Sequence, residues 1–147
     1  MWGENNPAYQ VLSLMDSNAK FGLKYATLAF VISGGGCSIN TFADDMISDI
    51  KAFIGVGGKL RMSFGGANGP YLEDACTDVT QIVSLIDGLI QRTGVYDLDF
   101  DVEGAYVAQA YQVVTDRRNA AIKQLQSKYS QLTVSLTLPV MPPVPEW

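Results

Sequence analysis

The sequence predicts an α/β protein whose strands run parallel, and three observations lead to this prediction. Apolar, strand-like runs alternate with amphipathic, helix-like segments along the chain. The later runs begin near residues 26, 59, 95 and 132, the spacing of a strand–helix–strand unit of about 30 residues or more. Glycine clusters end several of these segments, as expected at turns. This alternation favours a parallel sheet with helices packed against it.

Four strands are expected from apolar runs, and a weaker fifth is expected near the start. Residues 26–33 form a near-continuous apolar run, which is typical of a strand buried on both faces. Residues 60–64 form a shorter candidate strand, residues 95–102 form another, and residues 132–138 alternate with a period of two. Residues 9–15 are the weaker candidate. The chain would then contain five strands.

Three helices are expected between these strands. Residues 44–54 and 78–93 carry apolar side chains at helical spacing, and the second segment is the more clearly amphipathic. Residues 108–129 form a longer and more polar segment. The adjacent pair Arg117 and Arg118 lies in this segment, and we expect both side chains to face water.

Two architectures fit this order of elements. The 147 residues suit one domain with its own core, and no linker or low-complexity stretch divides them before a proline-rich end. Five strands would complete a doubly wound sheet of the flavodoxin type. They would equally form five of the eight strands of a closed barrel, which needs about 250 residues. Periodicity alone does not distinguish the two.

Composition and charge exclude several classes of function. The chain contains no histidine, which removes Ser-His-Asp and Cys-His catalysis and any imidazole metal site. Its net charge of −5 argues against binding to nucleic acid, which needs clustered lysine and arginine. No apolar run approaches the roughly 18 residues of a membrane span, so no membrane association is expected. The first residues do not have the pattern of a signal peptide.

The two cysteines leave two alternatives open. Cys37 and Cys76 are too far apart in the sequence for a CxxC redox or zinc motif, and both lie in segments that we interpret as loops. They are either two buried free thiols or a disulfide between loops. The disulfide would imply an oxidising compartment.

The most informative segment is a strand that carries four acids. Asp97, Asp99, Asp101 and Glu103 occupy alternate positions, with apolar residues between them. Alternate side chains of a strand share a face, so the four acids should point the same way. Crowding like charges on a covered face costs energy unless they are protonated or hydrogen-bonded. Glu103 would lie at the carboxyl end of the strand, where α/β folds bind ligands, and is our candidate general acid.

Two other interpretations of these acids are less favourable. An edge strand with its acids in water is disfavoured, because the strand is the fourth of a parallel series and lies between long helices. A calcium loop of the EF-hand type needs glycine at its sixth position, where this chain has Val102. We therefore expect no metal site.

At this point the chain resembles the family 18 glycoside hydrolases, the chitinase family. Asp99, Asp101 and Glu103 match the last three acids of that family's DxxDxDxE signature, whereas its first acid is replaced by Tyr96. The family's SxGG signature is matched by residues 63–66, Ser-Phe-Gly-Gly, about one βα unit earlier. The same glycines do not fit a dinucleotide-binding loop, which needs GxGxxG at the start of a helix. The resemblance covers nearly the whole chain.

The resemblance implies a parallel α/β fold of the TIM (β/α)8-barrel type, cut off after the fifth strand. Residues 1–147 would be a partial catalytic domain without counterparts of the last three strands. Such a piece could associate with itself, and its own activity is an open question. Cys37 and Cys76 fall where relatives have cysteines in neighbouring loops of the active face. An extracellular location is implied by the family and not by a signal in the chain.

The resemblance also implies a reaction and roles for residues. The substrate would be chitin or chito-oligosaccharides, hydrolysed without a cofactor by a retaining mechanism that uses the substrate's own N-acetyl group. Glu103 would be the general acid and base, Asp101 would orient the acetamido group, and Asp99 would support Asp101. The sugar subsite would be lined by Tyr9, Phe30 and Gly66.

Two rival functions remain. A non-catalytic chitin-binding relative would share the fold, but such proteins commonly lose the final glutamate, and Glu103 is retained. A flavodoxin-like regulatory or nucleotide-binding domain would distribute its acids over several strand ends. Here they lie on one strand.

Overall fold

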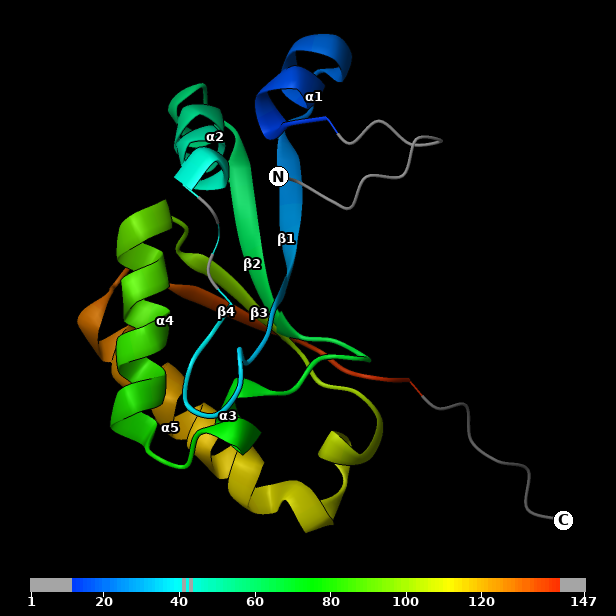
Figure 1. Ribbon diagram of the computed structural model, residues 1–147, viewed down its shortest axis with the longest axis vertical. Helices are drawn as coiled ribbons and strands as arrows, with labels where there is room; N and C mark the ends of the chain where they lie inside the picture. The colour runs from blue at the N-terminus through cyan, green and yellow to red at the C-terminus, as the bar shows by residue number, and fades with distance from the viewer. Residues whose placement is uncertain (1–11, 41, 43, 141–147) are drawn as a thin grey trace, which may run out of the picture.

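The computed structural model describes residues 12–40, 42 and 44–140, and the architecture is that of a parallel α/β protein. Within these residues the sheet has four strands in the order β1-β2-β3-β4, and every neighbouring pair is parallel. The strands confirm four of the five that were expected (Figure 1). Their bounds are Tyr25–Val31 for β1, Lys59–Gly65 for β2, Asp97–Asp101 for β3 and Thr133–Thr137 for β4.

Helices occupy the connections between the strands. The three expected helices are confirmed, and the last begins after two short 3₁₀ turns at Gly104–Val107 and Gln109–Tyr111. The longest amphipathic helix is fixed at both ends, because Asp78 accepts a hydrogen bond from the main-chain N–H of Thr80 and Gly94 adopts a left-handed conformation. The helices are α1 Leu14–Phe21, α2 Asp44–Gly55, α3 Leu72–Ala75, α4 Val79–Thr93 and α5 Gln112–Lys128.

The expected strand at residues 9–15 is wrong over the part that the structure describes. Residues 9–11 lie outside the described residues, and α1 begins at Leu14. The side chain of Ser13 accepts a hydrogen bond from the N–H of Asp16, so it caps the helix. The two preceding N–H groups, of Leu14 and Met15, donate to the carboxylate of Asp49 in α2 at 2.7 and 3.1 Å. These caps favour a helix at the position where a strand was expected.

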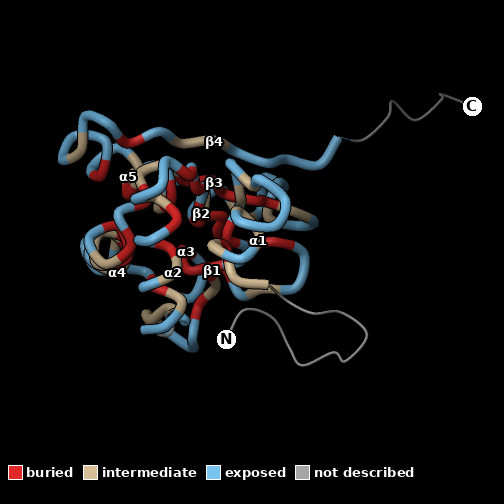
Figure 2. The backbone as a smooth tube through the Cα atoms, turned by 90° about the horizontal axis from the view of Figure 1, so that it is seen from above, coloured by how far each residue is buried: buried red, intermediate tan, exposed pale blue. Residues whose placement is uncertain are grey.

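The strand order decides between the two expected architectures. Each strand pairs with the next one in the chain, so every crossover runs in the same direction across the sheet. Right-handed crossovers in one direction place all their helices on one face, and α2, α4 and α5 lie together on one side of the strands (Figures 1 and 2). A doubly wound sheet reverses direction and has helices on both faces. The fold is thus one side of a (β/α)8-type barrel.

The hydrophobic core lies between the sheet and these helices. Met62 and Leu98 are fully buried on the helix-facing side of the two central strands, and Phe64 stacks on Phe100 with ring centroids 5.1 Å apart. The helices contribute a matching set of buried side chains: Ile82, Ile86, Leu89, Ile90 and Leu125. The two outer strands β1 and β4 are more exposed than the central pair (Figure 2). Among the described residues, no helix is both long and apolar enough to cross a membrane.

One expected surface residue is instead buried. Arg118 of α5 is 5% exposed and forms an ion pair with Glu73 of α3, with an N–O distance of 3.1 Å. Its neighbour Arg117 donates to the main-chain carbonyl of Glu73. The expectation that Arg118 faces water is therefore wrong, because α3, which was not expected, covers that turn of α5. Burial raises the pKa of Glu73, and Arg118 opposes this shift.

Candidate active site

The face of the sheet opposite the helices is lined by polar side chains in register. One row across the strands joins Ser63, Asp99 and Ser135, and the next row toward the carboxyl ends joins Gly65, Asp101 and Thr137. The interior of a (β/α)8 barrel is usually filled by branched apolar side chains. In this chain the same positions carry small hydroxyl groups and carboxylates.

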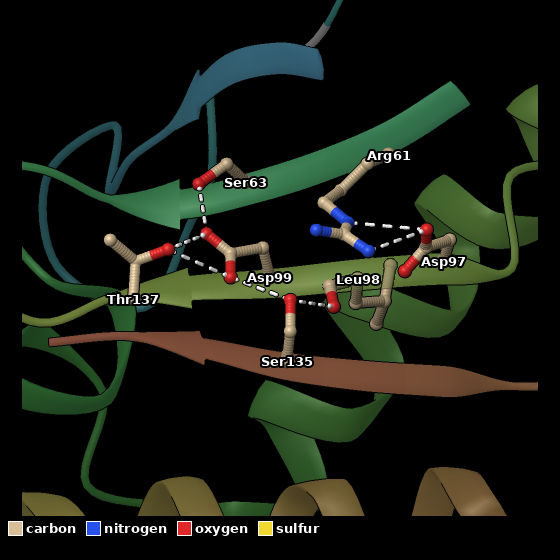
Figure 3. A network of polar contacts seen from close by, with 7 residues as sticks. All are labelled: Arg61, Ser63, Asp97, Leu98, Asp99, Ser135 and Thr137. Carbon is tan, nitrogen blue, oxygen red and sulfur yellow. Dashed lines mark hydrogen bonds and ion pairs between the residues drawn. The ribbon is translucent and has the colours of Figure 1, made fainter. Parts of the chain in front are cut away.

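Asp99 is the centre of this polar face (Figure 3). It is 5% exposed, and its carboxylate accepts hydrogen bonds from Ser63 Oγ at 2.9 Å and from Ser135 Oγ at 2.7 Å. Thr137 Oγ1 lies 3.0 and 3.1 Å from its two oxygens. Hydroxyl groups from the strands on both sides therefore provide the hydrogen bonds that a buried carboxylate needs. Ser63 of the Ser-Phe-Gly-Gly motif thus binds an acid of the second motif directly.

Asp97 has a different environment at the amino end of the same strand. It forms an ion pair with Arg61 at 3.1 Å, and both side chains are more than a third exposed (Figure 3). The four acids therefore do not act as one group. Asp97 is paired and exposed, whereas Asp99 and Asp101 are buried and approach the carboxyl end of β3.

Asp101 and Glu103 lie where β3 ends. The side chain of Asp101 is buried, and its Oδ1 atom has no hydrogen-bond partner among the residues that the structure describes. Glu103 lies two residues beyond the end of β3 and immediately precedes the first 3₁₀ turn. It is half-buried and borders a pocket of about 370 Å³, together with Phe30, Ile32 and Asn68.

The predicted subsite residues Phe30 and Gly66 are in contact. Gly66 has a φ of +84°, and a Cβ atom at this position would lie 3.0 Å from the ring of Phe30. Glycine therefore lets the aromatic ring lie against the backbone. Phe30 is still 49% exposed at the pocket. The third predicted residue, Tyr9, lies outside the described residues.

The two motifs also meet through their backbones. Gly65 has a φ of +95°, and a Cβ atom there would lie 2.5 Å from the carbonyl oxygen of Asp101 and 2.7 Å from the ring of Tyr71. Gly66 donates its N–H to the same carbonyl at 3.0 Å. Only glycine permits this approach. Gly65 is thus required by its contact with the acidic strand, whereas Gly66 is required by the ring of Phe30.

Several site residues were not found from the sequence. Tyr71 is 4% exposed, and its hydroxyl donates to the Asp101 carbonyl at 3.0 Å and accepts from the Glu103 N–H at 2.9 Å. Nothing in the local sequence pattern marks it. The hydroxyl residues Ser135 and Thr137 did carry a signal, because they alternate along β4 on the side where the acids of β3 point.

A disulfide connects the loops beside this pocket. Cys37, in the loop after β1, is bonded to Cys76 at the end of α3. The same two loops are joined by a hydrogen bond from the N–H of Ser33 to the carbonyl of Pro70 at 2.9 Å. The structure thus contains the disulfide that the sequence left as one of two alternatives.

Comparison with known proteins shows that the chain is similar in sequence to chitinases. No family model matches it. The chain is 32% identical over 131 residues to Endochitinase 11 of Metarhizium anisopliae. The match covers 82% of this chain and 24% of that protein, so the chain spans about a quarter of the length of its relative.

Solved structures agree with this relationship. The fold is similar to active domain 2 of a chitinase from Pyrococcus furiosus, with a TM-score of 0.70 at 21% identity over 90% of this chain and 43% of the other. A family GH18 chitinase from Chromobacterium violaceum gives a TM-score of 0.65 at 26% identity over 89% of this chain and 37% of the other. Sequence, fold and the paired motifs agree, and the chain belongs to the chitinase-like proteins of glycoside hydrolase family 18.

Proposed function

We propose that this chain forms part of a catalytic domain that hydrolyses β-1,4-linked N-acetylglucosamine polymers, with Glu103 as the general acid and base. The observation that carries the proposal is the position of Glu103. It borders a pocket beyond the carboxyl end of β3, two residues after the second of two buried acids of that strand. This end is where barrel enzymes place their catalytic groups.

The proposed reaction uses the substrate's own N-acetyl group as the nucleophile. Glu103 donates a proton to the glycosidic oxygen while the acetamido carbonyl oxygen attacks the anomeric carbon, and the leaving sugar departs as an alcohol. The product is a cyclic oxazolinium ion. The Glu103 carboxylate then takes a proton from a water molecule, whose oxygen attacks the anomeric carbon from the vacated side. The ring opens with retained configuration and Glu103 is protonated again. No cofactor takes part.

Asp101 is proposed to orient the acetamido group. The buried Oδ1 atom without a partner among the described residues supports this role, since a substrate N–H would satisfy an oxygen that is otherwise costly to bury. Asp99 is proposed to support Asp101 from the next position on the same face of β3, as a carboxylate held in place by the surrounding hydroxyl groups.

Phe30 and Gly66 are proposed to contact the sugar, as is Tyr9. Phe30 presents a half-exposed aromatic ring at the pocket, and such a ring provides an apolar surface for the face of a pyranose. The disulfide between Cys37 and Cys76 supports an extracellular location, because disulfides persist in oxidising environments.

The first test is binding by the chain itself, followed by NMR spectroscopy. We expect N-acetylchitotriose to shift the resonances of Phe30, Gly66 and Glu103, while cellotriose, which lacks the acetamido groups, leaves them unchanged. Equal responses to both sugars would contradict the proposed role of the N-acetyl group.

The second test is hydrolysis of a fluorogenic chitobioside. It compares the chain alone with the chain completed to a barrel by the remaining βα units of a homologous chitinase. We expect Glu103→Gln to lower the rate at least about 100-fold in whichever form is active, while Asp97→Asn, at the opposite end of β3, leaves the rate within about twofold. Sugar binding without hydrolysis in a folded, completed barrel would instead indicate a chitin-binding protein.

A further inference from the structure

We propose that Tyr71 is a positioning residue for Glu103, because its hydroxyl group holds the main chain on both sides of Val102 and so fixes the direction of the Glu103 side chain. The inference rests on the proposed function of Glu103. It concerns a residue that lies outside both sequence motifs and does not itself contact the reacting atoms.

The Tyr71 hydroxyl, and not a neighbouring strand, accepts the main-chain N–H of Glu103. The N–H of Val102 still donates to the carbonyl of Thr137 on β4, at 2.9 Å. The next N–H, of Glu103, lies beyond this ladder and donates to Tyr71 Oη at 2.9 Å, and the same hydroxyl donates to the Asp101 carbonyl at 3.0 Å. One side chain therefore connects the last residue of β3 with the proposed catalytic acid.

The ring that carries this hydroxyl is held firmly. Tyr71 is 4% exposed, its ring lies against the backbone of Gly65, and it contacts the ring of Tyr106 with centroids 4.1 Å apart. Tyr71 also caps α3, since its carbonyl accepts the N–H of Ala75 at 3.0 Å. A displacement of the ring would require movement of α3.

The helix α3 is itself attached to the rest of the molecule by a disulfide and a buried ion pair, among other contacts. Cys76, which follows its last residue, is bonded to Cys37 in the loop after β1. Glu73 pairs with the buried Arg118 of α5. The position of Tyr71 is thus determined by the packing of α3 against α5 and the loop after β1. Through Tyr71, these elements determine the position of the backbone at Glu103.

The arrangement requires a protonated phenol. A hydroxyl group can accept from one N–H and donate to one carbonyl, whereas a phenolate can only accept. Burial raises the pKa of Tyr71, so the donor is retained over the range in which proteins normally work. Phenylalanine at this position would keep the ring but leave the Glu103 N–H without its partner. The Asp101 carbonyl would keep only the N–H of Gly66.

The first experiment measures amide hydrogen exchange in this chain by NMR spectroscopy. We expect Tyr71→Phe to increase the exchange rate of the Glu103 amide at least about fivefold, while the Val102 amide, held by Thr137, keeps its protection. The control is Tyr129→Phe, which removes a hydroxyl bonded to Asp87 at 2.6 Å far from the site and should change neither amide. Equal acceleration of Val102 and Glu103 would show a general loss of stability and overturn the inference.

The second experiment measures kinetics with the chitobioside in the form that hydrolyses it. A small misplacement of a catalytic group lowers the rate of the chemical step more than substrate binding, so we expect Tyr71→Phe to lower kcat about 10-fold with KM within about twofold. Tyr129→Phe should leave both constants unchanged. A kcat within twofold of the wild type would overturn the inference. A wild-type barrel without activity would instead reject the proposed function, and the exchange of the Glu103 amide would then decide alone whether Tyr71 holds this backbone.

Discussion

The two faces of the sheet are built by the same strands and yet are held together by different forces. On the helix-facing side, Leu98 and Phe100 are buried among other apolar side chains. On the opposite side, Asp99 lies between them in the sequence and is surrounded by hydroxyl groups. Hydrophobic burial is nondirectional and scales with area, whereas each hydrogen bond on the polar face depends on one donor in one place.

A polar site can thus be placed inside a fold at low cost. The apolar face supplies most of the stabilisation, and the polar face stays intact because its carboxylate is satisfied by neutral groups. A buried ion pair occurs only in the helix layer among the described residues, between Glu73 and Arg118. Substitutions should therefore have effects that differ in size and kind between these regions.

The largest effect is expected on the apolar face. Phe100→Ala removes a ring that is 3% exposed and stacked on Phe64, and we expect a loss of about 3 to 5 kcal/mol in the free energy of unfolding, measured by urea denaturation. The control is Leu136→Ala on the neighbouring outer strand. Leu136 is 49% exposed and should cost no more than about 1 kcal/mol. Similar losses for both would contradict the view that the core lies under the central strands.

The second effect concerns the ion pair in the helix layer. Arg118→Met leaves Glu73 as a buried, uncompensated acid, and we expect a loss of about 3 kcal/mol at neutral pH. This loss is at the lower end of the range for a broken buried ion pair, because Arg117 already contacts Glu73 and is close enough to move toward its carboxylate. The double variant Glu73→Gln, Arg118→Met should recover part of the loss. No recovery would mean that the packing of Arg118 matters more than its charge.

The burial of Glu73 also leads us to expect that the stability of the fold depends on pH. Burial raises the pKa of Glu73 in the folded state above its ordinary value of 4.5, so between that value and the raised pKa the folded state binds more protons than the unfolded state. Stability contributed by Glu73 should therefore fall as the pH increases through this window. Glu73→Gln should remove this component from denaturation curves measured between about pH 4 and 7. An unchanged pH dependence would show that other acids cause it.

On the polar face, a smaller loss is expected. Ser63→Ala removes one donor to the buried Asp99, and we expect about 2 kcal/mol in urea denaturation, since hydrogen bonds to charged groups contribute about 1.5 to 3 kcal/mol. Thr137→Val is the matched change on an exposed residue and should cost less. A larger loss for Ser63→Ala than for Thr137→Val would show that burial of the hydroxyl group increases the contribution of its hydrogen bond to stability. The reverse order would contradict this view.

The smallest effect is expected at the amino end of the same face. Arg61→Met breaks the pair with Asp97, in which both side chains are more than a third exposed, and such pairs contribute at most about 1 kcal/mol. The difference from the wild type should shrink further in 1 M salt. A larger loss that salt does not reduce would mean that Arg61 acts through its packing.

The fold was predictable where periodicity and caps act locally. The spacing of strand starts predicted the parallel α/β class, and the acids at alternate positions of β3 predicted that they share one face. The first predicted strand failed because Ser13 caps a helix, although serine followed three residues later by Asp16 is itself a helix-start signal. The signal for a helix at this position was therefore present in the sequence.

The site was predictable only in part, for a physical reason. Asp99, Asp101 and Glu103 follow from strand alternation and from a motif, both of which depend on neighbours in the sequence. Tyr71 acts across 32 residues through one hydroxyl group, and a lone tyrosine in a loop has no pattern that indicates its partner. Arg118 was misplaced for the same reason, because only the three-dimensional position of α3 shows that it is covered.

The bond between Cys37 and Cys76 also has a topological consequence. The two cysteines are 39 positions apart, and the chain between them contains α2 and β2, so these elements form part of a closed covalent ring. A single cut within the ring, for example at the turn of residues 55–58 after α2, opens the ring but does not separate the protein into two pieces. The strand that carries Ser63 then has a free amino end at the nick, but it stays attached through its carboxyl end, and the amino-terminal piece stays attached to it through the disulfide. Only reduction of the disulfide releases the pieces.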